Sequence, residues 1–262
     1  MNIICCLKQV PSTETKIRIN PQTGLVDTNE VEWVINPYDE YALEMALRIR
    51  ETLGKGKITV ISLGPERVKM ALRTALAMGV DEAVQLCDSE FEGLDGLSIG
   101  RVLAAAVKKL GFDLVLTGKQ AIDDDLAWVP QSIAHFLNIP HCAVVPEVEL
   151  NRVDQGELVC HREIEGATEI VEVKLPCLVT VQKGKFQPRY PTLKLMMAAK
   201  KKEIPVWDRN TLGVDPSQLT RRVECIGHRL PPERKPGKIL EGDVNQVVPE
   251  LVRLLRDEAK VV

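Results

Sequence analysis

The chain has 262 residues, of which 45% are hydrophobic, 27% charged and only 4% aromatic, and its formal net charge is −3. These are ordinary values for a globular protein, and the length allows a sizeable buried core. The small acidic excess and the scarcity of aromatic rings argue against nucleic acid as a partner, because phosphate backbones need basic side chains and bases need stacking surfaces.

The first half of the chain alternates short apolar runs with longer amphipathic segments. The pattern predicts strands at 2–7, 57–63, 83–87 and 113–117, and helices at 39–51, 66–78, 97–110 and about 127–137. Parallel neighbouring strands need helical crossovers. We therefore expect an α/β fold with an open, mostly parallel sheet and helices on both faces.

The second half has a different texture. Short β-rich runs at 143–150, 157–164, 168–174 and 177–181 predict a β hairpin region and returning strands. A proline-containing loop with three successive lysines, at about 187–202, ends the expected core of 1–206. The segment 207–262 is predicted to be a C-terminal arm with a closing amphipathic helix at about 244–257. This arm either embraces another subunit or docks loosely on its own core.

The cysteines predict the compartment. Seven cysteines are widely spread without a C-x-x-C pair, which favours free thiols in a reducing environment over disulfides, zinc or an Fe–S cluster. The apolar start of the chain is too short for a signal peptide, and no segment reads as a transmembrane span. We expect a cytoplasmic protein.

Four loops are predicted to meet at one edge of the sheet. Open parallel sheets bind ligands beyond the carboxyl ends of their strands, where helix N-termini favour phosphate. The loops at this edge are 8–12, 36–39, 64–65 and 118–125. They predict a nucleotide pocket, although neither G-x-G-x-x-G nor G-x-x-x-x-G-K-[ST] is present, which disfavours a dehydrogenase or a kinase.

Each loop also has a purely structural interpretation. Asn36-Pro37 with Asp39 is equally typical of a turn and N-cap, and Gly64-Pro65 of a strand-to-helix corner. The three aspartates at 123–125 could bind Mg²⁺, cap the following helix or stay in water, and capping is favoured. The lysines at 200–202 could be a solvated face. The four histidines are scattered and no hydrolase motif is present, so no catalytic residue is assigned.

Motifs spread over nearly the whole chain match one family. They are NPYDE at 36–40, SLGP at 62–65, LRTALAMG at 72–79, GKQAIDDD at 118–125 and RYPTL at 189–193, which continues to the lysine run. Together they resemble the β subunit of electron-transfer flavoproteins. The resemblance implies an adenine-nucleotide α-hydrolase-like fold and a heterodimer with an α subunit that holds the redox FAD, with the C-terminal arm wrapped around that subunit.

The resemblance also implies where ligands and partners bind. Arg189, Tyr190 and Leu193 would dock an acyl-CoA dehydrogenase or a similar flavoenzyme, with Leu193 as the apolar anchor. Electrons would pass through the FAD of the α subunit to a quinone-linked oxidoreductase, an Fe–S oxidoreductase or another acceptor. The implied nucleotide contacts are Cys6, Asn36, Pro37, Tyr38, Asp39, Leu63, Gly64, Gln120, Ala121, Ile122, Asp123, Asp124, Asp125, Leu126, Ala127, Trp128, Val129, Pro130 and Gln131.

Two subtypes of the family remain open at this point. In one, the β site holds AMP and the protein is a one-electron carrier; in the other, an electron-bifurcating type, it holds a second FAD that reacts with NADH. The loop KQVP at 8–11 resembles the bifurcating type, and AIDDD at 121–125 resembles the AMP type. Leu126, Trp128 and Pro130 lack the glycine and hydroxyl character suited to a pyrophosphate, so AMP is favoured.

Overall fold

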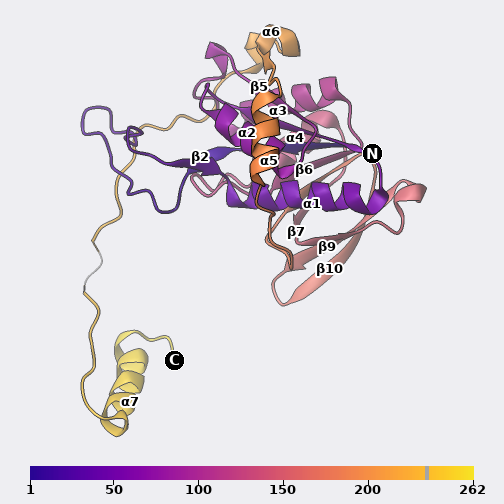
Figure 1. Cartoon of the computed structure of the whole chain (residues 1–262). Helices are drawn as coiled ribbons and strands as arrows, with labels where there is room; N and C mark the ends of the chain where they lie inside the picture. Colours follow the sequence, from indigo (N-terminus) through magenta and orange to yellow (C-terminus); the bar gives the residue numbers. More distant parts are fainter. Residues whose placement is uncertain (234–235) are drawn as a thin grey trace.

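A seven-stranded sheet forms the centre of the protein, in a computed structural model that describes residues 1–233 and 236–262. The strand order is β12-β5-β4-β1-β6-β11-β7, and every neighbouring pair is parallel. Figure 1 shows helices on both sides of this sheet, as the alternating pattern predicted. The strands are β1 (Asn2–Cys6), β4 (Lys57–Leu63), β5 (Glu82–Leu86), β6 (Leu114–Gly118), β7 (His141–Val145), β11 (Cys177–Val181) and β12 (Val206–Trp207).

The two faces of the sheet carry separate hydrophobic cores. Ile3 and Cys5 of β1 join the core beneath α1 (Pro37–Leu53) and α2 (Val68–Met78). Ile4 and Cys6, which point the opposite way, join the core beneath α3 (Gly96–Leu110) and α4 (Val129–Leu137). This alternation follows from the two-residue period of a strand. The central strands are buried on both faces, so they appear in the sequence as continuous apolar runs.

Helices α3 and α4 approach one another closely. A Cβ atom on Gly100 would lie 2.6 Å from the Cβ of Ser132. The Asp95 side chain caps α3 by accepting a hydrogen bond from the Ser98 amide at 2.9 Å. This close packing places the start of α4 at the carboxyl edge of the sheet.

Two antiparallel elements extend from the sheet. Strands β8 (Glu147–Glu149), β9 (Glu157–Ile164) and β10 (Ala167–Lys174) form the expected hairpin region. Strands β2 (Gln9–Pro11) and β3 (Trp33–Ile35) form a short ribbon that the sequence pattern did not predict. The connection between β2 and β3 projects from the body (Figure 1).

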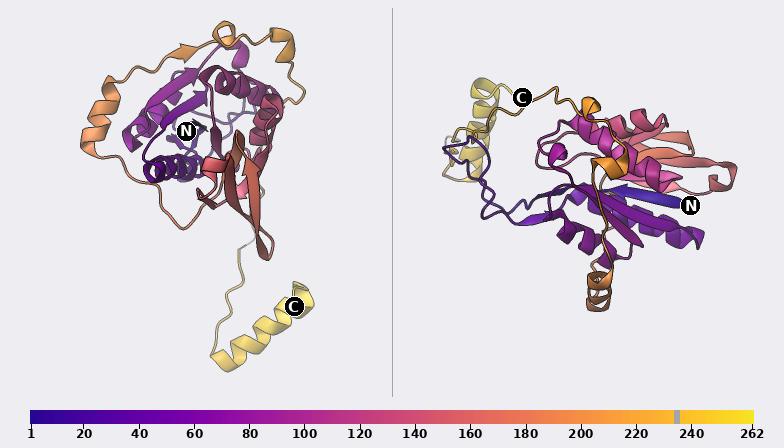
Figure 2. Two further views of the ribbon diagram at one scale, coloured as in Figure 1. Left: turned by 90° about the vertical axis from the view of Figure 1, so that its right-hand side faces the viewer. Right: turned by 90° about the horizontal axis from the view of Figure 1, so that it is seen from above.

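The segment at about 187–202, which was predicted to be a loop, contains a helix. Helix α5 (Leu193–Lys201) is capped by Thr192, whose side chain accepts a hydrogen bond from the Leu195 amide at 3.3 Å. The prolines that suggested a loop lie outside the helix, so they do not interrupt it. Figure 2 shows α5 on the rim of the molecule.

The last part of the chain first completes the core and then leaves it. The expected boundary at 206/207 falls inside β12, which pairs with β5, and α6 (Arg209–Leu212) packs against α3. Val214 and Leu219 are still buried. Further on lie α7 (Val244–Arg253) and a π turn, η4 (Leu254–Glu258); no residue of α7 is buried, and Figure 1 shows α7 away from the core. Short 3-10 turns are η1 (Ser89–Phe91), η2 (Val153–Gln155) and η3 (Pro216–Gln218).

A membrane span requires a helix that is both long and apolar. None of the helices formed by 1–233 and 236–262 is both long enough and apolar enough to cross a bilayer.

Candidate functional site

A cavity of about 140 Å³ lies where three neighbouring strands end. Cys6, Leu63 and Gly118 are the last residues of β1, β4 and β6, and loops from all three strands meet there. The lining residues are Cys6, Leu7, Lys8, Asn36, Asp39, Leu63, Ile99, Leu103, Thr117, Gly118, Gln120, Ala121, Asp124, Leu126, Val129, Pro130 and Ile133. Most of these are apolar, with a few convergent polar groups, as in small-molecule sites generally.

The buried carboxyl group of Asp39 joins two of these loops. It accepts hydrogen bonds from the Lys8 amide at 2.7 Å and from the Gly118 amide at 2.9 Å. A side chain at Gly118 would collide with this carboxyl group and with Tyr38, so glycine is required there. Burial raises the pKa of Asp39 to about 7, and the two amide bonds act in the opposite direction.

Asn36 ties the start of α1 to the third loop. Its side-chain amide donates to the Gln120 carbonyl at 2.9 Å and accepts from the Ile122 amide at 3.2 Å. Asn36 occupies the N-cap position of α1, but its side chain makes no capping bond. The motif therefore begins the helix, but the side chains of Asn36 and Asp39 hold the cavity loops together instead of capping α1.

The aspartate run does not cap the following helix either. Helix α4 has Trp128 at its N-cap position, without a side-chain capping bond. The Lys8 ammonium group lies 2.7 Å from carboxylate oxygens of both Asp123 and Asp124. Asp125 instead accepts from the Gln120 side chain at 2.7 Å. Lys8 therefore offsets the negative charge that this run brings to the cavity.

The start of α4 supplies unpaired amides to the same edge. The amides of Val129 and Gln131 lie in its first turn, where no carbonyl of the helix can accept from them. Pro130 has no amide, and its fixed φ suits a first helical turn. The positive end of the helix dipole adds to the preference for an anion at this position.

The structure brings many of the predicted nucleotide contacts together. Those that line the cavity are Cys6, Asn36, Asp39, Leu63, Gln120, Ala121, Asp124, Leu126, Val129 and Pro130. The others lie beside them in sequence without lining it: Pro37, Tyr38, Gly64, Ile122, Asp123, Asp125, Ala127 and Trp128. Gln131 lines a different hollow with His135 and His141.

Sequence reasoning missed one wall of the cavity. Ile99, Leu103 and Ile133 come from α3 and α4, and they are ordinary apolar positions of amphipathic helices. No local signal distinguishes them from other core residues. Lys8, by contrast, belongs to a loop already placed at this edge, and its charge beside three predicted aspartates was a usable signal.

The predicted docking residues differ in their environment. Tyr190 and Leu193 are 94% and 77% exposed. The guanidinium group of Arg189 is bound within the chain, with Nε 2.8 Å from Glu44 and Nη1 2.6 Å from Glu51. It therefore attaches this segment to α1.

The lysine run is also divided between two environments. The Lys202 ammonium donates to the backbone carbonyls of Val80 and Asp81 at 3.1 and 2.8 Å. Lys200 and Lys201 are exposed to solvent.

The fold and the cavity define an α/β protein whose ligand site lies at the carboxyl edge of a parallel sheet, at the start of a helix. Comparison with known proteins narrows this class. Residues 23–212 match the family described as the electron transfer flavoprotein domain. The chain belongs to this family.

Three relatives are similar over almost their whole length. The electron transfer flavoprotein subunit beta of Bacillus subtilis is 39% identical, with 100% of both chains covered. The human protein of the same description is 38% identical, covering 92% of this chain and 93% of its own. The caffeyl-CoA reductase-Etf complex subunit CarD of Acetobacterium woodii is 36% identical, covering 98% and 99%. The family resemblance seen in the motifs is thereby confirmed, and it implies flavin-linked electron transfer and an α-subunit partner.

Proposed function

We propose that this chain is the β subunit of a heterodimeric electron carrier whose redox FAD is held by the α subunit. In this proposal it takes electrons from acyl-CoA dehydrogenase-type flavoenzymes and passes them to a quinone-linked or another acceptor. In this proposal the chain has a positioning role: it provides a base for the α subunit and a docking segment for the flavoenzyme, and it supplies no catalytic residue. The reduced state of its cysteines fits a cytoplasmic setting.

The cavity supports an adenine nucleotide as its ligand. Leu63, Ile99 and Leu103 offer apolar contacts suited to a base, while the Val129 amide at the start of α4 suits a phosphate. The predicted contact segment 120–131 accordingly includes the loop and the helix start. This pairing of an apolar wall with a helix N-terminus is the observation that carries the proposal.

The rim of the cavity favours AMP. A dinucleotide would project past the rim, where Asp123 and Asp124 lie and where Pro130 supplies no amide. AMP would be a structural ligand, with no part in electron transfer.

One observation favours the alternative of a second FAD that reacts with NADH. The loop Lys8-Gln9-Val10-Pro11 resembles the electron-bifurcating type, and the relative CarD is described as part of a caffeyl-CoA reductase complex. In this structure the same loop forms β2 and supplies Lys8 to the cavity. The alternative would make the complex enzymatic.

We assign the C-terminal arm to the α subunit. Helix α7 has Val248, Leu251 and Val252 at least 41% exposed, which is unfavourable for a helix left in water. An α subunit seated on this side would cover them.

Identification of the released ligands tests the assignment. The purified heterodimer is denatured, and the supernatant is analysed by chromatography and mass spectrometry. We expect one FAD and one AMP per heterodimer. Two FAD without AMP would overturn the AMP assignment in favour of the alternative, and the absence of any flavin would overturn both.

A further inference from the structure

An exposed apolar surface joins two helices that are distant in the sequence. It consists of Met70 on α2 with Leu193, Met196 and Met197 on α5, and we call it the methionine surface. Met70, Leu193 and Met197 are 69%, 77% and 68% exposed, whereas large apolar side chains are usually buried. The family motif at 189–193 contains one residue of this surface, Leu193, and it does not include any residue of α2.

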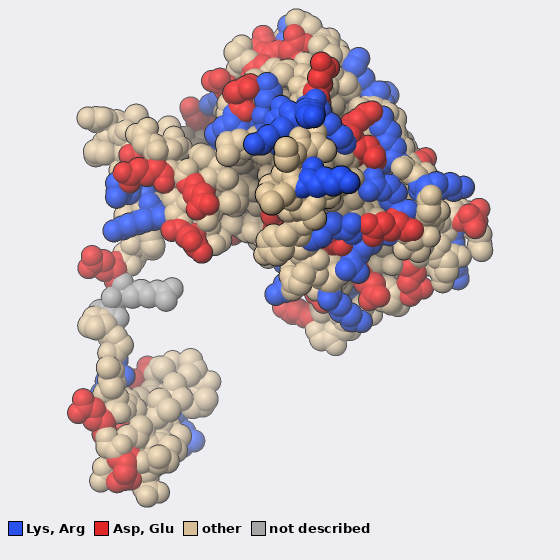
Figure 3. Space-filling model, viewed as in Figure 1, with Lys and Arg blue, Asp and Glu red and all other residues tan. Residues whose placement is uncertain are grey.

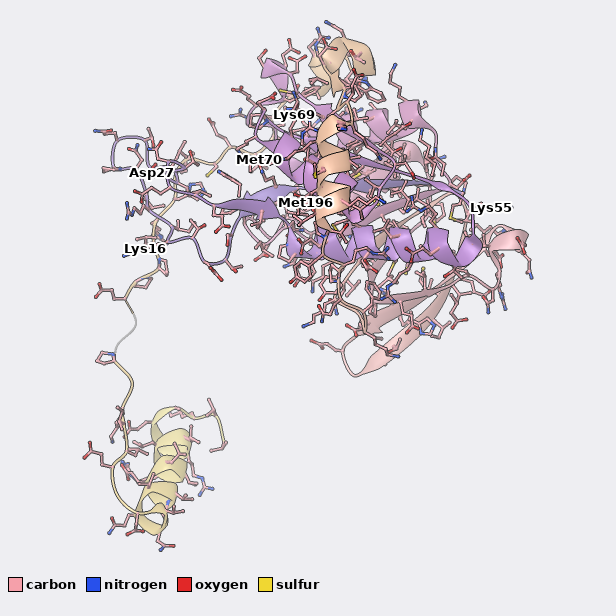
Figure 4. All side chains as sticks on the ribbon, in the orientation of Figure 1. Lys16, Asp27, Lys55, Lys69, Met70 and Met196 are labelled. Carbon is pink, nitrogen blue, oxygen red and sulfur yellow. The ribbon has the colours of Figure 1, made fainter. Side chains whose placement is uncertain are left out.

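Backbone contacts hold the two helices together. Arg73, on α2, donates to the carbonyls of Ala199, Lys200 and Lys202 at 2.9, 3.3 and 3.2 Å, and thus binds the C-terminal end of α5. Ala199 is buried against α2. Met70 precedes Arg73 by one turn, so it lies on the same side of α2. Figure 4 shows Met70 next to α5 and to Met196. The surface is therefore continuous across α2 and α5.

The surroundings of this surface are mostly basic. Lys69, Lys194, Lys200 and Lys201 lie on α2 and α5, and Lys69 pairs with Glu66 at 2.9 Å. Within 1–233 and 236–262, no carboxylate lies within 4.0 Å of the ammonium groups of Lys194, Lys200 or Lys201. Figure 3 shows an area of uncharged atoms in this region, with Lys and Arg above it and to its right. Such a surface is complementary to an apolar groove with an acidic rim.

We propose that the flavoenzyme docks on the whole methionine surface, with Met70 as a second apolar anchor beside Leu193. This inference rests on the proposed function and adds α2 to the docking surface. The partner presents an apolar groove bordered by Asp and Glu side chains. Methionine side chains are flexible and polarisable, so the surface adapts to grooves of somewhat different shape.

The test compares three substitutions in the intact heterodimer. Met70→Ala removes the second anchor, Leu193→Ala the first, and Ile170→Ala is the matched control, because Ile170 is 59% exposed on β10. The donor is whichever of a purified short-, medium- and long-chain acyl-CoA dehydrogenase reduces the unsubstituted heterodimer fastest. Reduction of the bound flavin is followed by its absorbance while the heterodimer concentration is varied.

We expect Met70→Ala to raise the half-saturating concentration of heterodimer about five- to tenfold, with an unchanged maximal rate. Leu193→Ala raises it as well, and Ile170→Ala leaves it unchanged. The double substitution Lys200→Gln and Lys201→Gln also raises the half-saturating concentration, and this increase becomes smaller as salt is added.

Other outcomes distinguish failure of the inference about Met70 from failure of the proposed function. An effect of Leu193→Ala without one of Met70→Ala overturns this inference and leaves the proposed function standing. No effect of either, or no reduction by any of the three dehydrogenases, overturns both. Dissociation of the heterodimer by Met70→Ala would assign α2 to the α subunit and overturn the inference.

Discussion

Replacing Arg189 with alanine should detach the predicted docking segment, 189–193, from α1. The side chain makes a paired contact with Glu44, whose side chain is only 3% exposed, and a second one with Glu51, whose side chain is 52% exposed. A hydrogen bond to a charged group contributes about 1.5–3 kcal/mol, and an exposed ion pair at most about 1 kcal/mol. Arg48, 2.9 Å from Glu44, remains and limits the loss. We expect a decrease of about 2–4 kcal/mol in the free energy of unfolding.

Urea denaturation of the heterodimer, followed by circular dichroism, measures this change. Arg189→Lys should cost about half as much, because it keeps the charge but loses the paired geometry. Glu51→Gln should cost less than about 1 kcal/mol. Bonds from Arg189 and Arg48 outweigh burial and keep the pKa of Glu44 below its usual 4.5, so the contribution of the pair is lost as pH falls below that value. An Arg189→Ala protein as stable as the unsubstituted one would refute the attachment of this segment to α1 through Arg189.

Three further predictions concern the cavity and the arm. The pKa of Asp39 is raised to about 7 from 3.8, so its contribution to stability is complete below pH 3.8 and is lost as pH rises through 7. Denaturation measured between pH 4 and 8 should show a steeper fall in the free energy of unfolding than in the Asp39→Asn protein. Equal slopes of stability against pH in the two proteins would contradict this. Lys8→Met should weaken AMP binding about tenfold in low-salt calorimetry, because Asp123 and Asp124 lose their counter-charge, whereas an unchanged affinity would separate Lys8 from the site. Removal of residues 244–262 should raise the dissociation constant of the heterodimer at least about tenfold in sedimentation experiments; equally tight assembly would mean that α7 binds elsewhere.

The sequence determined most of the sheet, because burial leaves a direct trace in residue type. Strands β4, β9 and β11 have the predicted bounds 57–63, 157–164 and 177–181. The alternation of strand and helix was sufficient to predict parallel pairing with two covered faces. The edge at which the loops meet followed from the same rule.

Other features depend on contacts between distant residues. Strands β2, β3 and β12 are two or three residues long, and only their partners make them strands. Helix α5 was hidden among prolines, and contacts with α2 hold its C-terminal end. The polar groups of Asn36 and Asp39 suggested a helix cap, but hydrogen bonds to Gln120, Ile122 and Gly118 take precedence in the folded chain.

The sequence by itself thus determined the α/β class, the family and the edge of the sheet that carries the cavity, since each depends on local pattern or motif. Only the tertiary structure decided what Arg189 and Lys8 contact, which apolar residues of α3 and α4 close the cavity, and that Met70 lies beside α5. Local periodicity specifies which face of an element is buried, but not which distant element covers it. That choice is made by packing across the whole chain.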